Sequence, residues 1–135
     1  MKICVSAVAN SLDAQLDPRF GRCPYFVIVD SESMQFEAIP NMASGAMGGA
    51  GIQAAQVIAS KGVKVLVTGN VGPNAFQALS AAGIKIVTGA FGTVKEVVEK
   101  YKKGELSETG APTVEGHFGM GMGRGRGRGR REWET

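Results

Sequence analysis

The residues best suited to chemistry lie in one short stretch, Arg19-Phe20-Gly21-Arg22-Cys23, which has a proline on each side. Its two guanidinium groups attract anions, and nearby positive charge lowers the pKa of a thiol. A thiolate in turn is a ligand for soft metals. The stretch therefore predicts an anion site built on Arg19 and Arg22, with Cys23 as a candidate metal ligand. The alternative is a purely structural loop in which Cys23 packs as a small apolar residue.

Two glycine-rich stretches are further candidates for holding an anion. Each leads directly into a predicted helix, where free backbone N–H groups and the helix dipole favour negative charge. The residues concerned are Gly48, Gly49, Gly51, Gly69, Asn70, Gly72 and Asn74. Neither stretch matches a GxGxxG motif or a P-loop, so no nucleotide is predicted. Tight turns and close packing of helices are the alternative explanation for these glycines.

Other donor side chains are few. Cys4 lies within an apolar stretch and is expected to be buried, whereas His117, the only histidine, lies in a glycine-rich tail near Met120 and Met122. The chain has no HExxH motif and no Ser/His/Asp set, so the sequence does not support hydrolytic catalysis. We expect no catalytic residue.

The elements that must position these candidates form an α/β pattern. Helical periodicity predicts a helix around residues 52–59, whose apolar face is formed by Ile52, Ala55, Ile58 and Ala59. It also predicts a second helix that begins at Pro73 and a third whose capping box joins Thr93 and Glu96. Apolar and β-branched runs predict strands over Lys2–Val8, Tyr25–Asp30, Gln35–Ile39, Val63–Thr68 and Ile84–Val87. This order predicts a mixed sheet with helices on its faces and both glycine-rich stretches at carboxyl ends of parallel strands.

The 135-residue chain has a net charge of +3 that is unevenly distributed. Residues 1–116 contain ten Lys and Arg against ten Asp and Glu, whereas residues 117–135 contain five arginines against two glutamates. A body without net positive charge argues against a DNA-binding domain. The change in composition predicts a domain over residues 1–108 and a flexible Gly/Met/Arg-rich tail over residues 109–135.

The cellular compartment is predicted from two features of the chain. No run of residues reaches the roughly 18 apolar positions of a membrane helix. The two cysteines are too few for a disulfide framework, and a low cysteine content is typical of proteins in a reducing cytoplasm. We therefore expect a cytoplasmic protein.

Three stretches of this sequence resemble the dinitrogenase iron–molybdenum cofactor biosynthesis (NifX/NifB-like) family, in particular its small stand-alone archaeal and bacterial members. The stretches cover residues 19–26, 48–55 and 67–75, within a likeness over about residues 1–105. The resemblance implies a ribonuclease H-like three-layer α/β/α fold with a five-stranded mixed sheet, ordered 3-2-1-4-5 and with strand 2 antiparallel. It also implies binding or carriage of iron–molybdenum-type clusters, or related molybdenum–sulfur species, without turnover. Nitrogenase-associated members commonly carry His-Phe-Gly where this chain has Arg19-Phe20-Gly21.

We therefore predict a small non-catalytic binding or carrier protein for an iron–molybdenum-type or other anionic metal–sulfur cluster. Its partners would be metal-cofactor assembly proteins. Arg19 and Arg22 would supply charge, Cys23 a thiolate ligand and the glycine-rich stretches backbone donors. Two alternatives belong to other classes: a metal-free regulatory or interaction domain, and an RNA-associated protein that acts through its Arg-Gly tail. That tail has no interleaved Phe or Tyr for stacking on bases.

Overall fold

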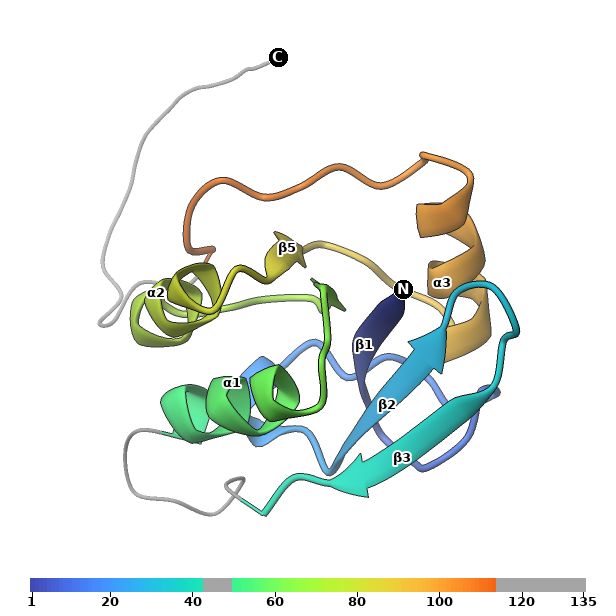
Figure 1. Cartoon of the computed structure of the whole chain (residues 1–135), viewed down its shortest axis with the longest axis horizontal. Helices are drawn as coiled ribbons and strands as arrows, with labels where there is room; N and C mark the ends of the chain where they lie inside the picture. Colours follow the sequence, from blue (N-terminus) through green and yellow to red (C-terminus); the bar gives the residue numbers. More distant parts are fainter. Residues whose placement is uncertain (43–49, 114–135) are drawn as a thin grey trace.

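The computed structural model describes residues 1–42 and 50–113, which form a five-stranded mixed sheet with helices on both faces (Figure 1). The spatial order of the strands is β3-β2-β1-β4-β5. Strand β2 is antiparallel to both of its neighbours, whereas β1, β4 and β5 are parallel. The strands are β1 (Lys2–Ala7), β2 (Tyr25–Asp30), β3 (Phe36–Pro40), β4 (Val65–Val67) and β5 (Lys85–Val87). The predicted order and the single antiparallel strand are both confirmed.

Three α-helices complete the layers. Helices α1 (Ala50–Ser60) and α2 (Pro73–Ala81) pack on one face of the sheet, and α3 (Val94–Lys102) packs on the other (Figure 1). The capping box of α3 forms as predicted, because Thr93 Oγ1 accepts the Glu96 N–H at 3.1 Å and Glu96 Oε1 accepts the Thr93 N–H at 2.8 Å. None of the helices among the described residues is long and apolar enough to span a bilayer.

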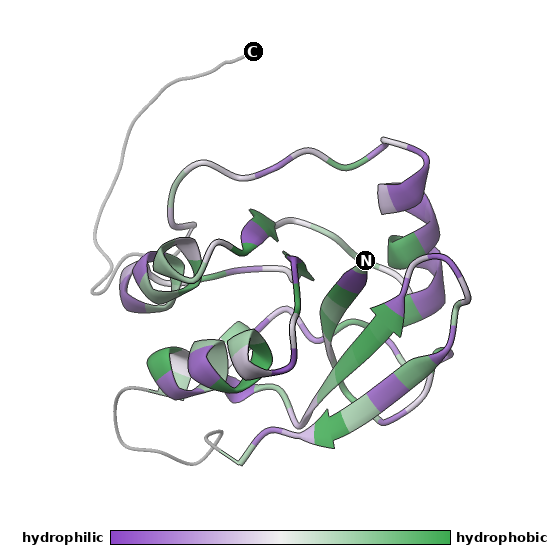
Figure 2. Ribbon diagram, viewed as in Figure 1, coloured by the Kyte–Doolittle hydropathy of each residue, from purple (hydrophilic) through white to green (hydrophobic). Residues whose placement is uncertain are grey.

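The alternation of side chains along β1 divides the core into two layers. Cys4 points to the cluster beneath α1 and α2, whereas Ile3 and Val5 point to the cluster beneath α3. All three side chains are fully buried, as expected for a central strand. Figure 2 shows that β2 is hydrophobic along most of its length, whereas hydrophobic and hydrophilic residues alternate along the helices.

Helix α1 departs from the sequence interpretation in the face that it buries. Ile52 was expected on the buried face, but it is 36% exposed, and the buried positions are Ala50, Ala54, Ala55 and Ile58. Small residues on that face let the helix approach its neighbours closely, which leaves Ile52 at the edge of a cavity. The sequence analysis also missed the 3-10 helix η1 (Phe20–Arg22), which lies in the long connection between β1 and β2.

Candidate functional site

A cavity of about 420 Å³ opens where the connections after β1 and β4 meet the first residues of α1 and α2. Residues 19–22, 50–52 and 70–75 line it. Its volume lies within the range of about 300–1,000 Å³ that is usual for small-molecule sites. Carboxyl ends of parallel strands are the common place for ligand crevices in α/β sheets. The cavity is therefore the best candidate for a binding site among the described residues.

The connection after β1 is held beside the connection after β4 by backbone contacts. The Asn70 N–H donates to the Pro18 carbonyl at 2.8 Å, and Arg19 and Asn70 form an isolated parallel bridge. Gly69 makes this approach possible, because a Cβ at this position would lie 2.6 Å from Pro18 Cα. The glycine is thus needed for the close approach that places Arg19 at the cavity.

The first turn of α1 is also packed closely against its neighbours. A Cβ on Gly51 would lie 2.7 Å from Ala75 Cβ in α2, and a Cβ on Gly21 would lie 3.2 Å from the Gly51 nitrogen. These glycines bring η1 and the amino ends of two helices to one cavity. Gly72, the N-cap of α2, has no side chain to cap the first turn. The helix dipoles and backbone N–H groups at this point favour an anion.

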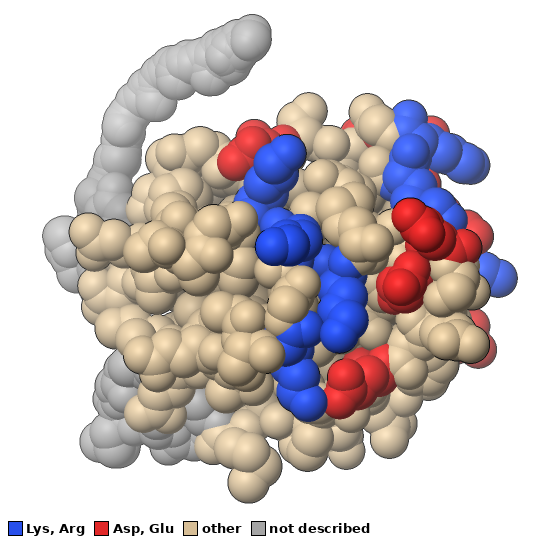
Figure 3. Space-filling view, in the orientation of Figure 1, with Lys and Arg blue, Asp and Glu red and all other residues tan. Residues whose placement is uncertain are grey.

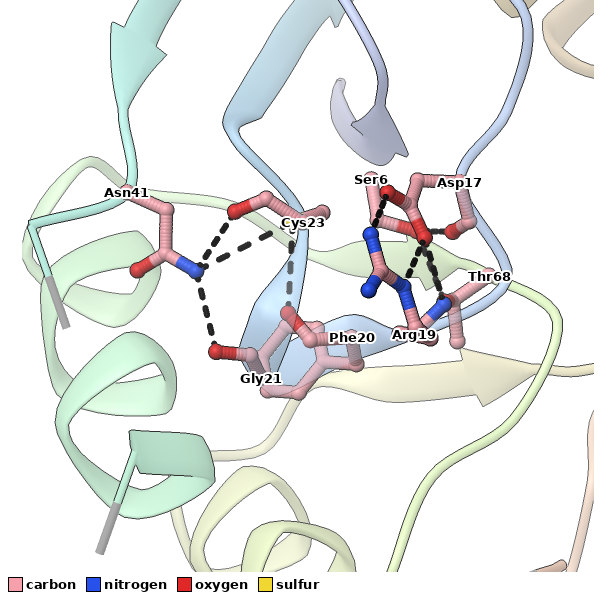
Figure 4. A network of polar contacts seen from close by, with 8 residues as sticks. All are labelled: Ser6, Asp17, Arg19, Phe20, Gly21, Cys23, Asn41 and Thr68. Carbon is pink, nitrogen blue, oxygen red and sulfur yellow. Dashed lines mark hydrogen bonds and ion pairs between the residues drawn. The ribbon is translucent and has the colours of Figure 1, made fainter. Parts of the chain in front are cut away.

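Arg19 is held in place by a buried carboxylate. Its Nε and Nη2 donate to Asp17 Oδ1 and Oδ2 at 3.0 and 2.9 Å, and its backbone N–H donates to Oδ1 at 2.9 Å (Figure 4). The Asp17 side chain is 3% exposed, whereas that of Arg19 is 64% exposed. These hydrogen bonds hold the pKa of Asp17 below its usual value. A bidentate ion pair of this kind fixes the orientation of a guanidinium group.

A buried hydroxyl pair supports the Asp17 backbone. Ser6 Oγ donates to the Asp17 carbonyl at 2.6 Å and lies 2.7 Å from Thr68 Oγ1, and the Asp17 N–H donates to the Ser6 carbonyl at 2.8 Å (Figure 4). Both hydroxyls are fully buried at the carboxyl ends of β1 and β4. The sequence analysis did not single out this network. The one sequence feature that indicates this network is the spacing of Asp17 and Arg19 on either side of a proline.

Cys23 lies apart from the cavity. Its side chain is fully buried, and its Sγ donates to the Phe20 carbonyl at 3.3 Å. Asn41 Nδ2 donates to the carbonyls of Gly21 and Cys23 at 3.1 and 2.9 Å, which ties this turn to the end of β3 (Figure 4). Burial, followed by the charge of Asp17, raises the pKa of the Cys23 thiol to about 12. The lowered pKa expected from neighbouring arginines is therefore not found, and ligation by Cys23 stays a prediction.

The charge at the cavity comes from two arginines. Arg19 and Arg22 are the charged residues among those that line it, and neither α1 nor α2 contains a charged residue. In Figure 3 the surface over α1 and α2 carries no charged side chain, while Lys and Arg side chains form a band across the middle of the view. The described lining residues include no acidic side chain, but the Asp17 carboxylate behind Arg19 offsets part of the positive charge of that arginine.

The structure brings together most of the residues that the sequence proposed. Six of them line the cavity: Arg19, Arg22, Gly51, Asn70, Gly72 and Asn74. Gly69 and Cys23 have structural contacts next to it, and Gly48 and Gly49 lie outside the described residues. No three His, Cys, Asp or Glu side chains within residues 1–42 and 50–113 gather closely enough to hold a metal ion. The donors present suit an anion better than a bare cation.

Comparisons with known proteins agree with this fold. Residues 1–104 match the protein family described as dinitrogenase iron-molybdenum cofactor. An uncharacterized protein of Methanocaldococcus jannaschii is 30% identical over 112 residues, which cover 80% of this chain and 95% of that protein. The chain therefore belongs to the dinitrogenase iron-molybdenum cofactor family.

Two solved structures are particularly similar. The apo form of the orange protein from Desulfovibrio gigas has a TM-score of 0.81 and 44% identity, over 83% of this chain and 95% of that chain. A NifB-like protein from Thermotoga has a TM-score of 0.70 and 37% identity, over 79% of this chain and 91% of that chain.

Proposed function

We propose that this protein binds and carries an anionic metal–sulfur cluster, or a precursor of one, in the cavity beside Arg19. The observation that carries the proposal is the clamp of Arg19 by Asp17 at the edge of a cavity formed by two helix N-termini. Arg19 and Arg22 would compensate the negative charge of the cargo. Backbone N–H groups near Asn70, Gly72 and Asn74 would donate to its outer atoms.

The chemistry of the cavity matches cargo that brings its own ligands. A bare metal ion needs carboxylate, imidazole or thiolate donors, and the described lining residues offer none. A metal already surrounded by sulfide needs positive charge and hydrogen-bond donors, which the lining does offer. Membership in a family described by the iron-molybdenum cofactor, and a relative solved in an apo form, support cargo of this class.

A carrier role suits the site better than catalysis. The carboxylate of Asp17 accepts three hydrogen bonds from Arg19. It is therefore poorly suited to act as a general base. Partners would be proteins that assemble metal cofactors, working in the cytoplasm. The metal-free interaction domain is the competing proposal, and it predicts that the cavity binds no anion.

Binding of tetrathiomolybdate by the full chain under argon tests the proposal, with visible absorbance and equilibrium dialysis as readouts. We expect saturable uptake near one anion per chain, weaker at high salt because screening reduces the attraction. Arg19→Ala should reduce affinity about 10- to 100-fold, the usual value of a charged hydrogen bond of about 1.5–3 kcal/mol.

Lys85→Ala is the matched control, because this exposed lysine begins β5 at the amino end of the strand, away from the cavity. It should bind like the unchanged protein. Equal binding by Arg19→Ala and the unchanged protein would place the anion elsewhere. Absence of binding by the unchanged protein would favour the metal-free interaction domain.

A further inference from the structure

Four lysines form a continuous row at the amino ends of the parallel strands, and we call Lys61, Lys2, Lys64 and Lys85 the lysine row. The Lys64 N–H donates to the Lys2 carbonyl at 3.0 Å, and the Lys85 N–H donates to the Lys64 carbonyl at 2.9 Å. Lys2 Nζ in turn donates to the Lys61 carbonyl at 3.1 Å. These hydrogen bonds place each lysine next to another one, although the four come from distant parts of the sequence.

The charge of the lysine row is only partly compensated by carboxylates. Lys61 Nζ donates to Glu37 Oε2 at 3.0 Å. Lys64 and Lys85 are exposed, and no carboxylate of the described residues forms a salt bridge with either. Adjacent strands are about 4.8 Å apart, so ammonium groups at neighbouring strand ends repel one another. Because residues 1–116 have no net charge, the row is a local concentration of positive charge.

A hollow of about 240 Å³ lies beside the lysine row. Lys2 lines the hollow and belongs to the row, while the other lining residues come from β2, β3 and the turn between them: Ile28, Asp30, Gln35, Phe36 and Glu37. The Phe36 side chain is 44% exposed there. This edge of the sheet therefore offers positive charge next to an exposed aromatic ring, and protein interfaces combine apolar contacts with a polar rim in this way.

We propose that the lysine row and the hollow form a docking surface for the acidic face of another protein. Carboxylates of that protein pair with Lys64 and Lys85, and one of its apolar side chains enters the hollow beside Phe36. Complementary charge of this kind accelerates the encounter and fixes the orientation of the two proteins.

The docking surface lies at the opposite end of the strands from the cavity. The lysine row is at the amino ends of β1, β4 and β5, whereas the cavity opens at carboxyl ends, and the hollow and the cavity share no lining residue. A protein bound at the lysine row therefore leaves the mouth of the cavity open. The inference does not depend on the proposed function, because it makes no use of an anion in the cavity.

The neighbours of the lysine row favour a protein over nucleic acid. Asp30 and Glu37 lie beside it and would repel a phosphate backbone, whereas a protein surface can place carboxylates only opposite the lysines. Figure 3 shows acidic side chains next to the band of Lys and Arg side chains. The three lysines at the strand ends span two strand spacings, about 10 Å, which is a short track for a nucleic acid.

The test uses a synthetic peptide of glutamates with two central leucines as the probe, titrated into the ¹⁵N-labelled full chain at low salt. We expect saturable changes in amide shifts at Lys64, Lys85 and Phe36, and none at Gly51 and Asn70 in the cavity. Single-stranded oligouridine is titrated in parallel and should bind more weakly. A version of the peptide with serines in place of the leucines should also bind more weakly, because nothing enters the hollow.

Reversal of charge identifies the lysines responsible. The double variant Lys64→Glu, Lys85→Glu should bind the acidic peptide about fivefold or more weakly, since two attractions become repulsions. The difference should shrink at high salt. A peptide with lysines in place of the glutamates should bind this variant more tightly than it binds the unchanged protein.

The matched control changes the same net charge elsewhere. Lys95→Glu, Lys102→Glu alters two exposed lysines of α3, and it should bind the acidic peptide like the unchanged protein. Thermal melts establish that both double variants are folded. Equal loss in the two variants would overturn the lysine row, because net charge alone would then explain the binding.

The remaining outcomes separate other occupants from an acidic protein. Absence of saturable peptide binding, or shift changes away from the lysine row, overturns the proposal. Tighter binding of oligouridine at the same amides assigns the surface to nucleic acid instead. A dimer in sedimentation that the Lys64 and Lys85 changes dissociate, without peptide binding, assigns it to a second copy of this chain. Tetrathiomolybdate titration of the same variant should be unchanged, so this proposal and the proposed function fail separately.

Discussion

Asp17 and Arg19 form a clamp in which one buried carboxylate accepts three hydrogen bonds from one arginine, two from its side chain and one from its backbone. The carboxylate is almost fully buried, but most of the guanidinium side chain is exposed. Asp17 therefore acts as a positioning residue, since it orients a charged group at the cavity without lining the cavity itself.

Replacing Asp17 by Asn tests this positioning. An amide keeps one acceptor for the Arg19 backbone but loses the charge and the bidentate pairing, so we expect weaker anion binding by about tenfold and a loss of about 1–2 kcal/mol in the free energy of unfolding. Asp13→Asn is the matched control, because Asp13 is an exposed aspartate in the same connection. Anion titration and urea unfolding provide the two readouts. Indistinguishable titrations of the two variants would refute the clamp.

The stability of the clamp depends on pH in a defined direction. The pKa of Asp17 is lowered in the folded protein, so its contribution to stability is complete above its unfolded pKa of about 3.9 and is lost as pH falls through the lower folded pKa. The difference in unfolding free energy between the unchanged protein and Asp17→Asn should be constant from about pH 7 to 5 and should shrink below about pH 4. A difference that grows with acid would contradict the ion pair.

Gly69 should tolerate no side chain. A Cβ at this position would lie 2.5 Å from Pro18 Cβ and 2.6 Å from Pro18 Cα, both parts of a rigid residue. Gly69→Ala is expected to lower the free energy of unfolding by about 1–3 kcal/mol, the usual effect of overpacking. It should also weaken anion binding, because Arg19 would move with the shifted connection. Gly110→Ala is the control, since a Cβ there meets no atom within 4 Å, and its thermal melt should be unchanged.

The reactivity of the Cys23 thiol distinguishes a metal ligand from a buried core residue. Burial raises its thiol pKa to about 12, so the native protein should react slowly with thiol reagents at pH 8 and rapidly once unfolded. The folded protein disfavours the thiolate, and stability should therefore fall as pH rises above the unfolded thiol pKa of about 8.5.

Substitution of Cys23 by Ala then decides its role in binding. We expect anion affinity within about threefold of the unchanged protein, because Sγ does not line the cavity, and a modest loss of stability from the deleted sulfur. Refolding is monitored by circular dichroism before titration. Loss of binding by a folded Cys23→Ala protein would support the hypothesis that the Cys23 thiolate is a ligand.

The individual elements were predictable because their signals are local, whereas the strand order was implied by the resemblance to a known family. The apolar run at β1, the Thr93–Glu96 capping box and Pro73 at the start of α2 each specify one element, and the order of elements leaves few topologies. The cavity was predictable in part, since glycines before helices and arginines in a long connection are visible in the sequence. The clamp was not, because it depends on Asp17 being buried against Ser6 and Thr68, which come from other segments.

The failures of the sequence interpretation have the same origin. Proximity to Arg22 in sequence suggested a lowered pKa for the Cys23 thiol, but the turn at Phe20 carries Sγ into the core, where burial raises that pKa. Helical periodicity assigned Ile52 to the buried face of α1 together with Ala55 and Ile58. The latter two are buried, but Ile52 is exposed at the edge of the cavity. Tertiary packing determines the burial of Cys23 and the exposure of Ile52, and no local sequence pattern indicates that packing.

A chemical-shift map of the ¹⁵N-labelled full chain tests whether the anion binds in the cavity beside Arg19. Tetrathiomolybdate is added under argon, and backbone amide shifts are followed to saturation. We expect the largest changes at cavity residues such as Gly21, Gly51, Asn70 and Gly72, and no change at the amides of β3 and Lys85. Shifts concentrated outside residues 19–22, 50–52 and 70–75, or no saturable shifts at all, would contradict it.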